Sequence, residues 1–167
     1  DRYSMYKELH PLMKKVDYSV REDWLKQLRT WVNAGEQGRE THRPMNIDEL
    51  LRLDRSEWVT IGAHTVNHIP LSILSHDRQR KEIMDSKEQL EKCIGHDVKV
   101  FSYPFGTKWD YDRDSAEICK REGFVRVASN FPGQAHRWTD PFQIPRQLVR
   151  NWSVEIFKEK MKKFRIL

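Results

Sequence analysis

The chain has little cysteine, and this excludes a scaffold stabilised by several disulfides. Cys93 and Cys119 are its only cysteines, and we interpret both as buried thiols in helical stretches. Long apolar runs are also missing. No segment approaches the roughly 20 apolar residues that a membrane span needs, so the sequence predicts no transmembrane helix. Disorder is excluded in turn, because aromatic and aliphatic residues are plentiful and fall in periodic clusters.

A strong excess of charge of one sign is missing from most of the chain. Lys and Arg number 30 against 25 Asp and Glu, a net charge of +5. Segment 150–167 holds six basic and two acidic residues, so +4 of this charge lies there. The rest shows no basic stripe of the kind that nucleic-acid binders carry. We therefore expect no nucleic-acid partner and interpret the tail as a solvated helix. The rival interpretation, nucleic-acid binding through the tail, would give steeply salt-dependent binding.

Linkers rich in Gly, Pro or Ser are absent, which favours one domain overall. Residues 1–43 are polar with a helical pattern, and we interpret them as a helical insertion or connector ahead of a main portion at 44–167. The chain begins at Asp1 without Met, so we expect it to start within a longer protein.

The helical signals near the N-terminus are specific. Ser19 and Glu22 have capping-box spacing, an apolar stripe follows over 24–32, and Gly35 is placed to end that helix. A polar loop is expected over 35–43. A short helix should then start at Asn46, with Glu49 completing a second capping box and Met45 and Leu50 spaced as a hydrophobic staple.

From residue 57 onwards the pattern alternates between strands and helices. Such alternation is typical of a parallel α/β sheet or barrel. The strands are expected at 57–63, 98–102 and 124–129, and the helices at 77–94 and 112–122. In this architecture reactive residues gather on loops at the carboxyl ends of the strands.

The first such loop holds two histidines four residues apart, His64 and His68, just before Pro70. Imidazoles at this spacing can turn toward one point, as pairs of zinc ligands do. The alternative is a pair of ordinary surface histidines. Two ligands do not complete a site, because catalytic zinc usually has three protein ligands and a water. The other histidines, His10, His42, His76, His96 and His136, show no obvious pairing and are interpreted as surface residues.

The second loop reads Tyr103-Pro104-Phe105-Gly106. Pro fixes φ and Gly permits positive φ, so the backbone can bend tightly with an N–H pointing outward. Such a donor suits an oxyanion hole, although an ordinary turn at a strand exit has the same composition. A third segment places Arg146 in an apolar, strand-like setting. There it could form a structural salt bridge, or it could orient a catalytic acid.

These segments in this order resemble the polysaccharide deacetylases of carbohydrate esterase family 4, which carry the NodB homology domain. The resemblance covers roughly residues 44–150 and rests on MNIDEL, IGAHTVNH, FSYPFG, Gly123-Phe124 and IPRQLV. It implies an α/β fold: part of a distorted (β/α) barrel with parallel strands and an N-terminal helical insertion. It further implies that His64 and His68 ligate a divalent metal, most simply zinc, and that Thr65 steadies their loop.

The resemblance also assigns the remaining site residues. The backbone N–H of Tyr103 would serve the oxyanion, Pro104, Phe105 and Gly106 would line the substrate groove, and Arg146 would contact the catalytic aspartate. The family's Thr-Phe-Asp-Asp motif, which supplies the base and the third metal ligand, is missing from the chain. We expect that aspartate upstream of Asp1.

Two carboxylates of this chain, Asp17 and Asp54, lie in the wrong context to replace the missing motif. The family's late Leu-x-His motif, which carries the general acid, is not recognisable either. His136 is the nearest candidate for that role.

The implied activity is metal-dependent removal of acetyl groups from a sugar or polysaccharide, so the expected partner is an acetylated carbohydrate. Phe105, Trp109 and Trp138 could offer faces to sugar rings. We expect the chain as given to be inactive by itself. The alternative is a non-catalytic carbohydrate-binding or structural module that keeps the fold. The sequence leaves the oligomeric state open.

Overall fold

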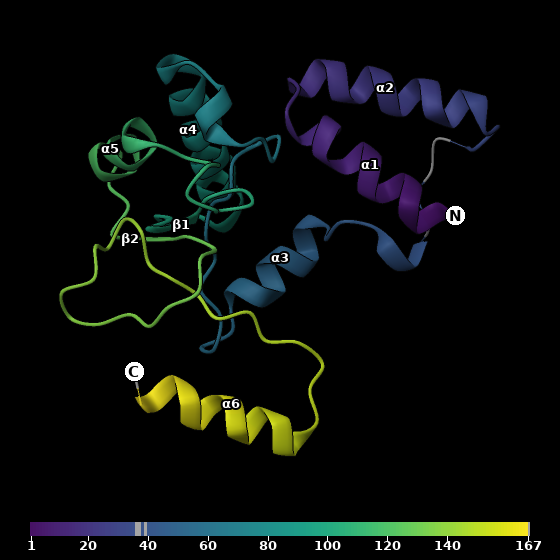
Figure 1. Ribbon diagram of the computed structural model, residues 1–167. Helices are drawn as coiled ribbons and strands as arrows, with labels where there is room; N and C mark the ends of the chain where they lie inside the picture. Colours follow the sequence, from purple (N-terminus) through teal and green to yellow (C-terminus); the bar gives the residue numbers. More distant parts are fainter. Residues whose placement is uncertain (36–37, 39, 167) are drawn as a thin grey trace.

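The computed structural model describes residues 1–35, 38 and 40–166 (Figure 1). The described elements follow one another as α1 (Arg2–Lys14), α2 (Tyr18–Trp31), η1 (Glu40–His42), α3 (Ile47–Asp54), η2 (Leu71–Ile73), α4 (His76–Ile94), β1 (Val100–Ser102), α5 (Arg113–Arg121), β2 (Arg126–Ala128) and α6 (Val154–Ile166).

A small parallel sheet lies at the centre of the molecule. β1 pairs with β2 in parallel, with Phe101 opposite Val127. Single bridges extend the pairing on both sides: Ala63 joins Phe101, and Ile144 joins Ala128. Two of the three expected strands are therefore confirmed in shortened form, with the parallel direction that the alternation predicts.

The expected strand at 57–63 is wrong in extent, because only Ala63 makes a bridge. Residues 57–60 are exposed, and Trp58 is 88% accessible. A run of apolar residues forms a buried strand only where neighbours cover both of its faces. Within the described residues the sheet is not closed into a ring, so the barrel expected from the resemblance is seen only as this short parallel core.

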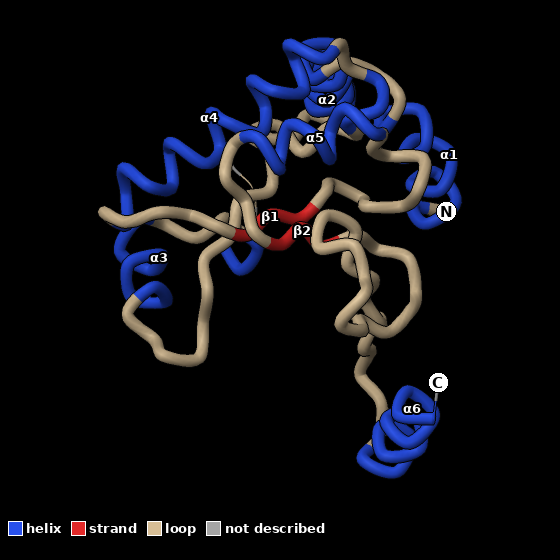
Figure 2. Tube along the Cα trace, turned by 90° about the vertical axis from the view of Figure 1, so that its left-hand side faces the viewer, coloured by secondary structure: helices blue, strands red, loops and turns tan. Residues whose placement is uncertain are grey.

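Helices α4 and α5 lie together on one side of the sheet (Figure 2). Beneath them is one cluster of buried apolar side chains that includes Ile83, Phe101, Tyr103, Ile118 and Val127. Cys119 is buried in this cluster, as predicted. Cys93 is exposed, so the prediction that it is buried is wrong. Burial raises the pKa of Cys119 to about 12.

Most predicted helix boundaries are confirmed. α4 ends at Gly95 with φ of +80°, and α5 is followed by Gly123 with φ of +83°, the left-handed conformation that glycine tolerates best. The capping box of Asn46 and Glu49 is present in both directions. Ser75 occupies the N-cap position of α4, but its side chain makes no capping hydrogen bond.

The boundaries of α2 differ from those expected. Its N-cap is Asp17, whose carboxylate accepts the Ser19 N–H, so the predicted box of Ser19 and Glu22 is wrong. A carboxylate two positions earlier competes for the same backbone donors. The helix ends at Trp31, and Asn33, with φ of +50°, takes the left-handed position predicted for Gly35. The polar loop expected at 35–43 falls partly outside the described residues, at 36, 37 and 39.

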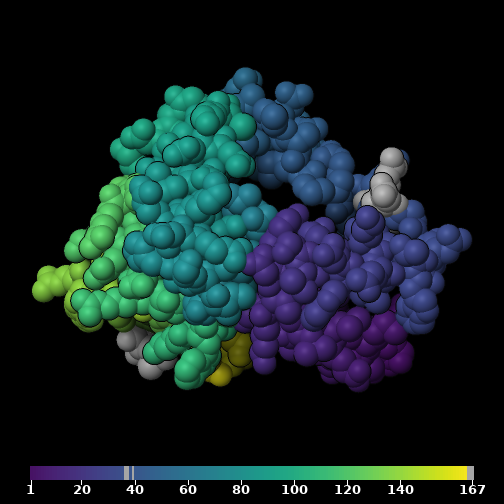
Figure 3. Space-filling view, turned by 90° about the horizontal axis from the view of Figure 1, so that it is seen from above, coloured from purple at the N-terminus to yellow at the C-terminus, as the bar shows by residue number. Residues whose placement is uncertain are grey.

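Helices α1, α2 and α3 bury none of their residues. They attach to the rest of the molecule through polar contacts, and seen from above α1 and α2 lie against the segment that carries α4 (Figure 3). α6 stands apart at the end of an extended segment (Figures 1 and 2). None of the described helices combines the length and the apolar character needed to cross a bilayer.

Candidate functional site

The loop after Ala63 brings the two predicted histidines together. The ring centroids of His64 and His68 are 4.9 Å apart, with the rings nearly perpendicular. The Thr65 hydroxyl accepts the His68 N–H at 3.1 Å, so the side chain expected to steady the loop does contact it. Thr65 and His68 both have positive φ, +62° and +50°. The short distance between the ring centroids places the two imidazoles side by side.

The sheet determines how the His64 ring presents its nitrogens. Nδ1 lies 2.7 Å from the carbonyl oxygen of Ser102, the last residue of β1, and 2.9 Å from the Ser102 hydroxyl. A carbonyl can only accept, so Nδ1 carries the proton in that bond. The other nitrogen, Nε2, then has its lone pair free. A histidine that donates one ring N–H to a carbonyl is the arrangement typical of metal ligands.

The surroundings of His68 favour its neutral form. Partial burial lowers the pKa of His68 below its usual value, and the neighbouring His64 lowers it further. Phe105 supplies part of that cover, with its ring centroid 4.7 Å from that of His68. Metal binding requires neutral imidazole, so a lowered pKa favours ligation at neutral pH.

Tyr103 does not fit the oxyanion role expected for it. Its backbone N–H already donates to the carbonyl of Ala128 in β2 at 3.1 Å. Its side chain is fully buried, stacks on Tyr111 with ring centroids 3.9 Å apart, and donates its hydroxyl to the carbonyl of Phe142. Tyr103 continues the pairing of β1 with β2, so its backbone N–H is not available to an oxyanion.

The turn that follows Tyr103 presents a different donor. Phe105 has φ of +58°, and within the described part of the chain its N–H has no acceptor. Pro104 and Gly106 are buried, so of the three residues expected to line the groove only Phe105 faces the pocket described below. Gly106, with φ of +69°, is required by space as well, because a Cβ there would lie 2.9 Å from the Asn130 nitrogen.

Arg146 is exposed, so the apolar, strand-like setting expected for it is wrong. Its Nε donates to the carbonyl of Ser129 at 2.5 Å, and its own N–H donates to the carbonyl of Phe131. No carboxylate among the described residues pairs with it. The contacts with Ser129 and Phe131 hold the side chain in place while the terminal nitrogens of the guanidinium remain available.

A pocket of about 400 Å³ brings His64, Phe105 and Arg146 together, and His68 lies outside its lining, against Phe105. Its lining consists of His64, Ser102, Tyr103, Phe105, Asn130, Arg146, Gln147, Leu148 and Val149. None of these residues is a carboxylate, and no third His, Cys, Asp or Glu joins the histidine pair within the described chain. Asp17 is paired with Arg78, and Asp54 with His96. His136 stacks on Trp138, outside the pocket lining.

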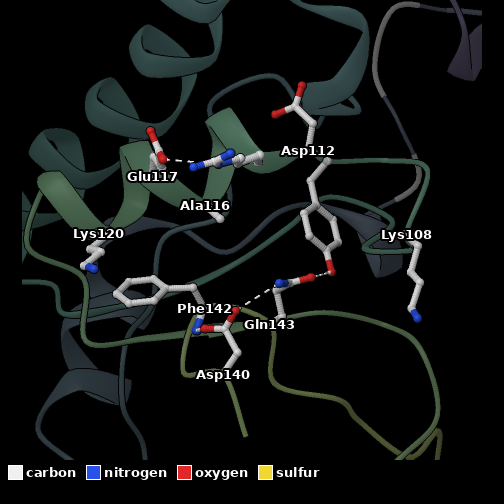
Figure 4. A pocket seen from close by; sticks show the side chains of 10 residues that line it. Lys108, Asp112, Ala116, Glu117, Lys120, Asp140, Phe142 and Gln143 are labelled. Atoms are coloured by element: carbon white, nitrogen blue, oxygen red, sulfur yellow. Dashed lines mark hydrogen bonds and ion pairs between the residues drawn. The ribbon is translucent and has the colours of Figure 1, made fainter.

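A second pocket, of about 590 Å³, lies between α5 and residues 140–143 (Figure 4). Its polar groups largely satisfy one another: Arg113 pairs with Glu117, Gln143 donates to Asp140, and the Tyr111 hydroxyl donates to Gln143. It contains no histidine and no cysteine. The smaller pocket at the histidine pair is therefore the better candidate for chemistry.

Three comparisons relate the chain to known proteins. The sequence profile of the family described as polysaccharide deacetylase matches residues 27–127. The Bacillus subtilis protein YxkH, whose name assigns it to the polysaccharide deacetylases, is 24% identical over 96 residues. That match covers 58% of this chain and 33% of YxkH.

Solved structures of deacetylases share the fold. The deacetylase PplD of Streptococcus pyogenes, solved with acetate, superimposes with a TM-score of 0.64 at 23% identity, over 73% of this chain and 53% of that one. A polysaccharide deacetylase from Bacillus cereus gives a TM-score of 0.62 at 21% identity, over 73% of this chain and 38% of that one.

The chain thus spans about a third of YxkH and about half of PplD. The profile match nevertheless covers most of the chain and includes the histidine pair, Phe105 and most of the parallel sheet. Its start within α2 leaves α1 outside the matched region. The chain belongs to the polysaccharide deacetylase family.

Proposed function

We propose that this chain contributes the histidine pair of a metal-dependent enzyme that removes acetyl groups from a sugar or polysaccharide. The observation that carries the proposal is the His64–His68 pair itself. One ring is held by Ser102 and lines a pocket that presents Phe105 and Arg146, and the other, whose pKa is lowered by partial burial, lies against the Phe105 ring. Family membership supports the reaction class, since it connects this geometry to deacetylation.

A divalent metal, most simply zinc, fits the donors that are present. Zinc takes neutral imidazole nitrogens, and the Nε2 lone pair of His64 is free for this. When bound, such an ion would polarise the acetyl carbonyl and lower the pKa of a water, so that this water could lose a proton and attack the carbonyl. The third ligand and the general base would come from an aspartate pair of the family's Thr-Phe-Asp-Asp type, which these 167 residues do not contain.

The chain's own residues would complete the site around the acetyl group. The Phe105 N–H, on the turn beside His68, is the donor we assign to the developing oxyanion in place of Tyr103. The Arg146 guanidinium, held by Ser129, would orient the aspartate that acts as base. The Phe105 ring at the edge of the pocket would also contact the sugar.

A non-catalytic role remains the second candidate, and one observation favours it. Within the described residues the pocket lining contains no carboxylate, and no third His, Cys, Asp or Glu is grouped with the histidine pair so that it could hold a metal. A module that binds acetylated carbohydrate without hydrolysing it would need only the pocket. Such a module would bind an acetylated oligosaccharide equally well with and without zinc.

Metal content and acetate release separate these alternatives. We expect the 167-residue chain to bind zinc weakly and to release no acetate from an acetylated chitooligosaccharide, because affinity depends on the number of ligands. A polypeptide that extends beyond Asp1 to include an Asp-Asp pair should gain both properties. In it, His64→Ala should lose metal and activity together, whereas Arg146→Ala should keep the metal and lose rate. Robust acetate release by residues 1–167 alone would mean that the general base lies within this chain, whereas an extended polypeptide that binds no metal and releases no acetate would contradict the proposal.

A further inference from the structure

A carboxylate from outside the pocket holds the backbone of the histidine loop. Glu82, on α4, accepts the N–H of Val66 at 3.0 Å and the N–H of Asn67 at 2.9 Å through one oxygen. Its other oxygen accepts the side-chain amide of Asn67 at 2.6 Å. Both oxygens are thus directed at the segment between His64 and His68. None of these hydrogen bonds involves His64 or His68 itself.

The loop is held from a second direction by the N-terminal helices. Arg21, on α2, donates to the carbonyl of Asn67 at 2.5 Å and to the carbonyl of His68 at 3.3 Å. Asn67 therefore has its N–H bound to a carboxylate and its carbonyl bound to a guanidinium. Charged partners form stronger hydrogen bonds than neutral ones, so these contacts hold the peptide segment more firmly than neutral partners would.

The backbone of the loop explains why such support is needed. Thr65 and His68, at the two ends of the contacted segment, both have the left-handed φ that residues with a Cβ avoid. Conformations of this kind persist only where the surrounding contacts over-determine them. Two successive N–H groups turned toward one anion are a common device for fixing such a turn.

We propose that Glu82 is a positioning residue for the His64–His68 pair. By binding the two N–H groups between the histidines, it fixes the relative placement of their rings, and it does so without contacting metal or substrate. The inference rests on the proposed function of the pair as metal ligands. It goes beyond that function by assigning the geometry of the pair to a side chain of α4.

The test compares three variants of the 167-residue chain. Glu82→Ala removes every acceptor. Glu82→Gln keeps one oxygen for the backbone N–H groups of Val66 and Asn67 but places an NH₂ group, which cannot accept, opposite the side-chain amide of Asn67. Glu88→Ala, at an exposed position of the same helix, is the matched control. Circular dichroism and thermal unfolding show whether each variant folds.

The first measurement needs no metal. Hydrogen exchange of the Val66 and Asn67 amides, followed by NMR, should be about tenfold faster in Glu82→Ala, as expected when a charged acceptor is lost. Exchange at β1 should stay unchanged. Glu82→Gln should fall between Glu82→Ala and the wild type, and Glu88→Ala should match the wild type. Because Glu82→Gln preserves the shape of the side chain, its exchange rates decide the question if Glu82→Ala does not fold.

The second measurement is zinc affinity by competition with a chromophoric chelator. Loss of a residue that orients metal ligands typically weakens binding by about 10–100-fold, and we expect this for Glu82→Ala, a smaller loss for Glu82→Gln and none for Glu88→Ala. Unchanged loop exchange in the folded Glu82 variants, or zinc affinity equal to that of Glu88→Ala, would overturn the role of Glu82. If the wild type itself binds no zinc, the proposed ligand pair fails for this chain, while loop exchange still decides whether Glu82 holds the loop.

Discussion

Two parts of this molecule are held together by different forces. The part made of α4, β1, α5 and β2 contains the cluster of buried apolar side chains, from Ala63 to Val127. Helices α1, α2 and α3 bury no residue and are attached through ion pairs and hydrogen bonds. Apolar burial stabilises the first part and depends little on salt or pH, whereas the attachment of the second depends on charged contacts in which at least one partner is partly exposed to water. The histidine loop lies between the two and is held by both, through Glu82 and Arg21.

The largest effect should come from the core. Tyr103→Ala removes a fully buried ring that stacks on Tyr111 and contacts Phe101. We expect the free energy of unfolding to fall by about 3–5 kcal/mol, as for other large-to-small aromatic substitutions. Urea unfolding followed by circular dichroism measures it.

Tyr103→Phe is the control for that experiment. It keeps the ring but loses the hydroxyl that donates to the Phe142 carbonyl, so the free energy of unfolding should fall by about 1 kcal/mol. If Tyr103→Ala were no more harmful than Tyr103→Phe, packing around this ring would not be what stabilises the α4–β1–α5–β2 part.

A smaller effect is expected where α1 meets that part. Lys14 pairs with Asp110 at 2.5 Å and lies over the Phe105 ring at 4.4 Å. Asp110 is almost fully buried, so Lys14→Ala leaves a carboxylate without its counter-charge. Asp110 keeps its bonds to Thr107, and we expect a cost of about 1–3 kcal/mol. Hydrogen exchange should show α1 opening before β1 does.

The control is Lys15→Ala, at the next and more exposed position of the same segment. It should leave both stability and exchange unchanged. Equal exchange of α1 in Lys14→Ala and in the wild type would mean that this helix is attached by something other than its ion pair.

The smallest effect should be a pH dependence at α3. Asp54 accepts a hydrogen bond from His96 and raises the pKa of that imidazole above its usual value. A histidine whose pKa is raised on folding stabilises the folded state fully at pH values below its pKa in the unfolded chain, about 6.5. This stabilisation is lost as the pH rises through the pKa of the histidine in the folded chain. The difference in the free energy of unfolding between pH 5.5 and pH 8.5 should therefore be smaller for His96→Gln than for the wild type. A wild-type difference that persists in His96→Gln would assign the dependence to other groups.

The sequence predicts best those features that depend on residues close together along the chain. Gly95 and Gly123 end their helices as expected, because a left-handed residue is a local requirement, and the reciprocal cap of Asn46 and Glu49 is equally local. The helix α4 and the parallel pairing of β1 with β2 were predictable from periodicity. The strand at 57–63 was not, since its burial depends on neighbours that the described residues do not supply.

At the site, sequence predicted the residues better than their roles. His64, Phe105 and Arg146 meet at one pocket, as expected from their places after strands. The Tyr103 N–H, expected to be free, is taken up by the Ala128 carbonyl, because whether Tyr103 still pairs with β2 is set by register and not by composition. Glu82 was missed entirely. Its signal would have been an acidic residue on α4, but sequence does not show that this turn of the helix faces the histidine loop.

The unequal environments of the two cysteines give the molecule a natural point of attachment for a probe. Cys119 is buried and its pKa is raised to about 12, so it remains a thiol at ordinary pH and resists alkylation. Cys93 is exposed in the last turn of α4. A maleimide dye or spin label would therefore attach at one place without any mutation. That place lies on the same helix as Glu82, so the probe would be carried by the element that holds the histidine loop.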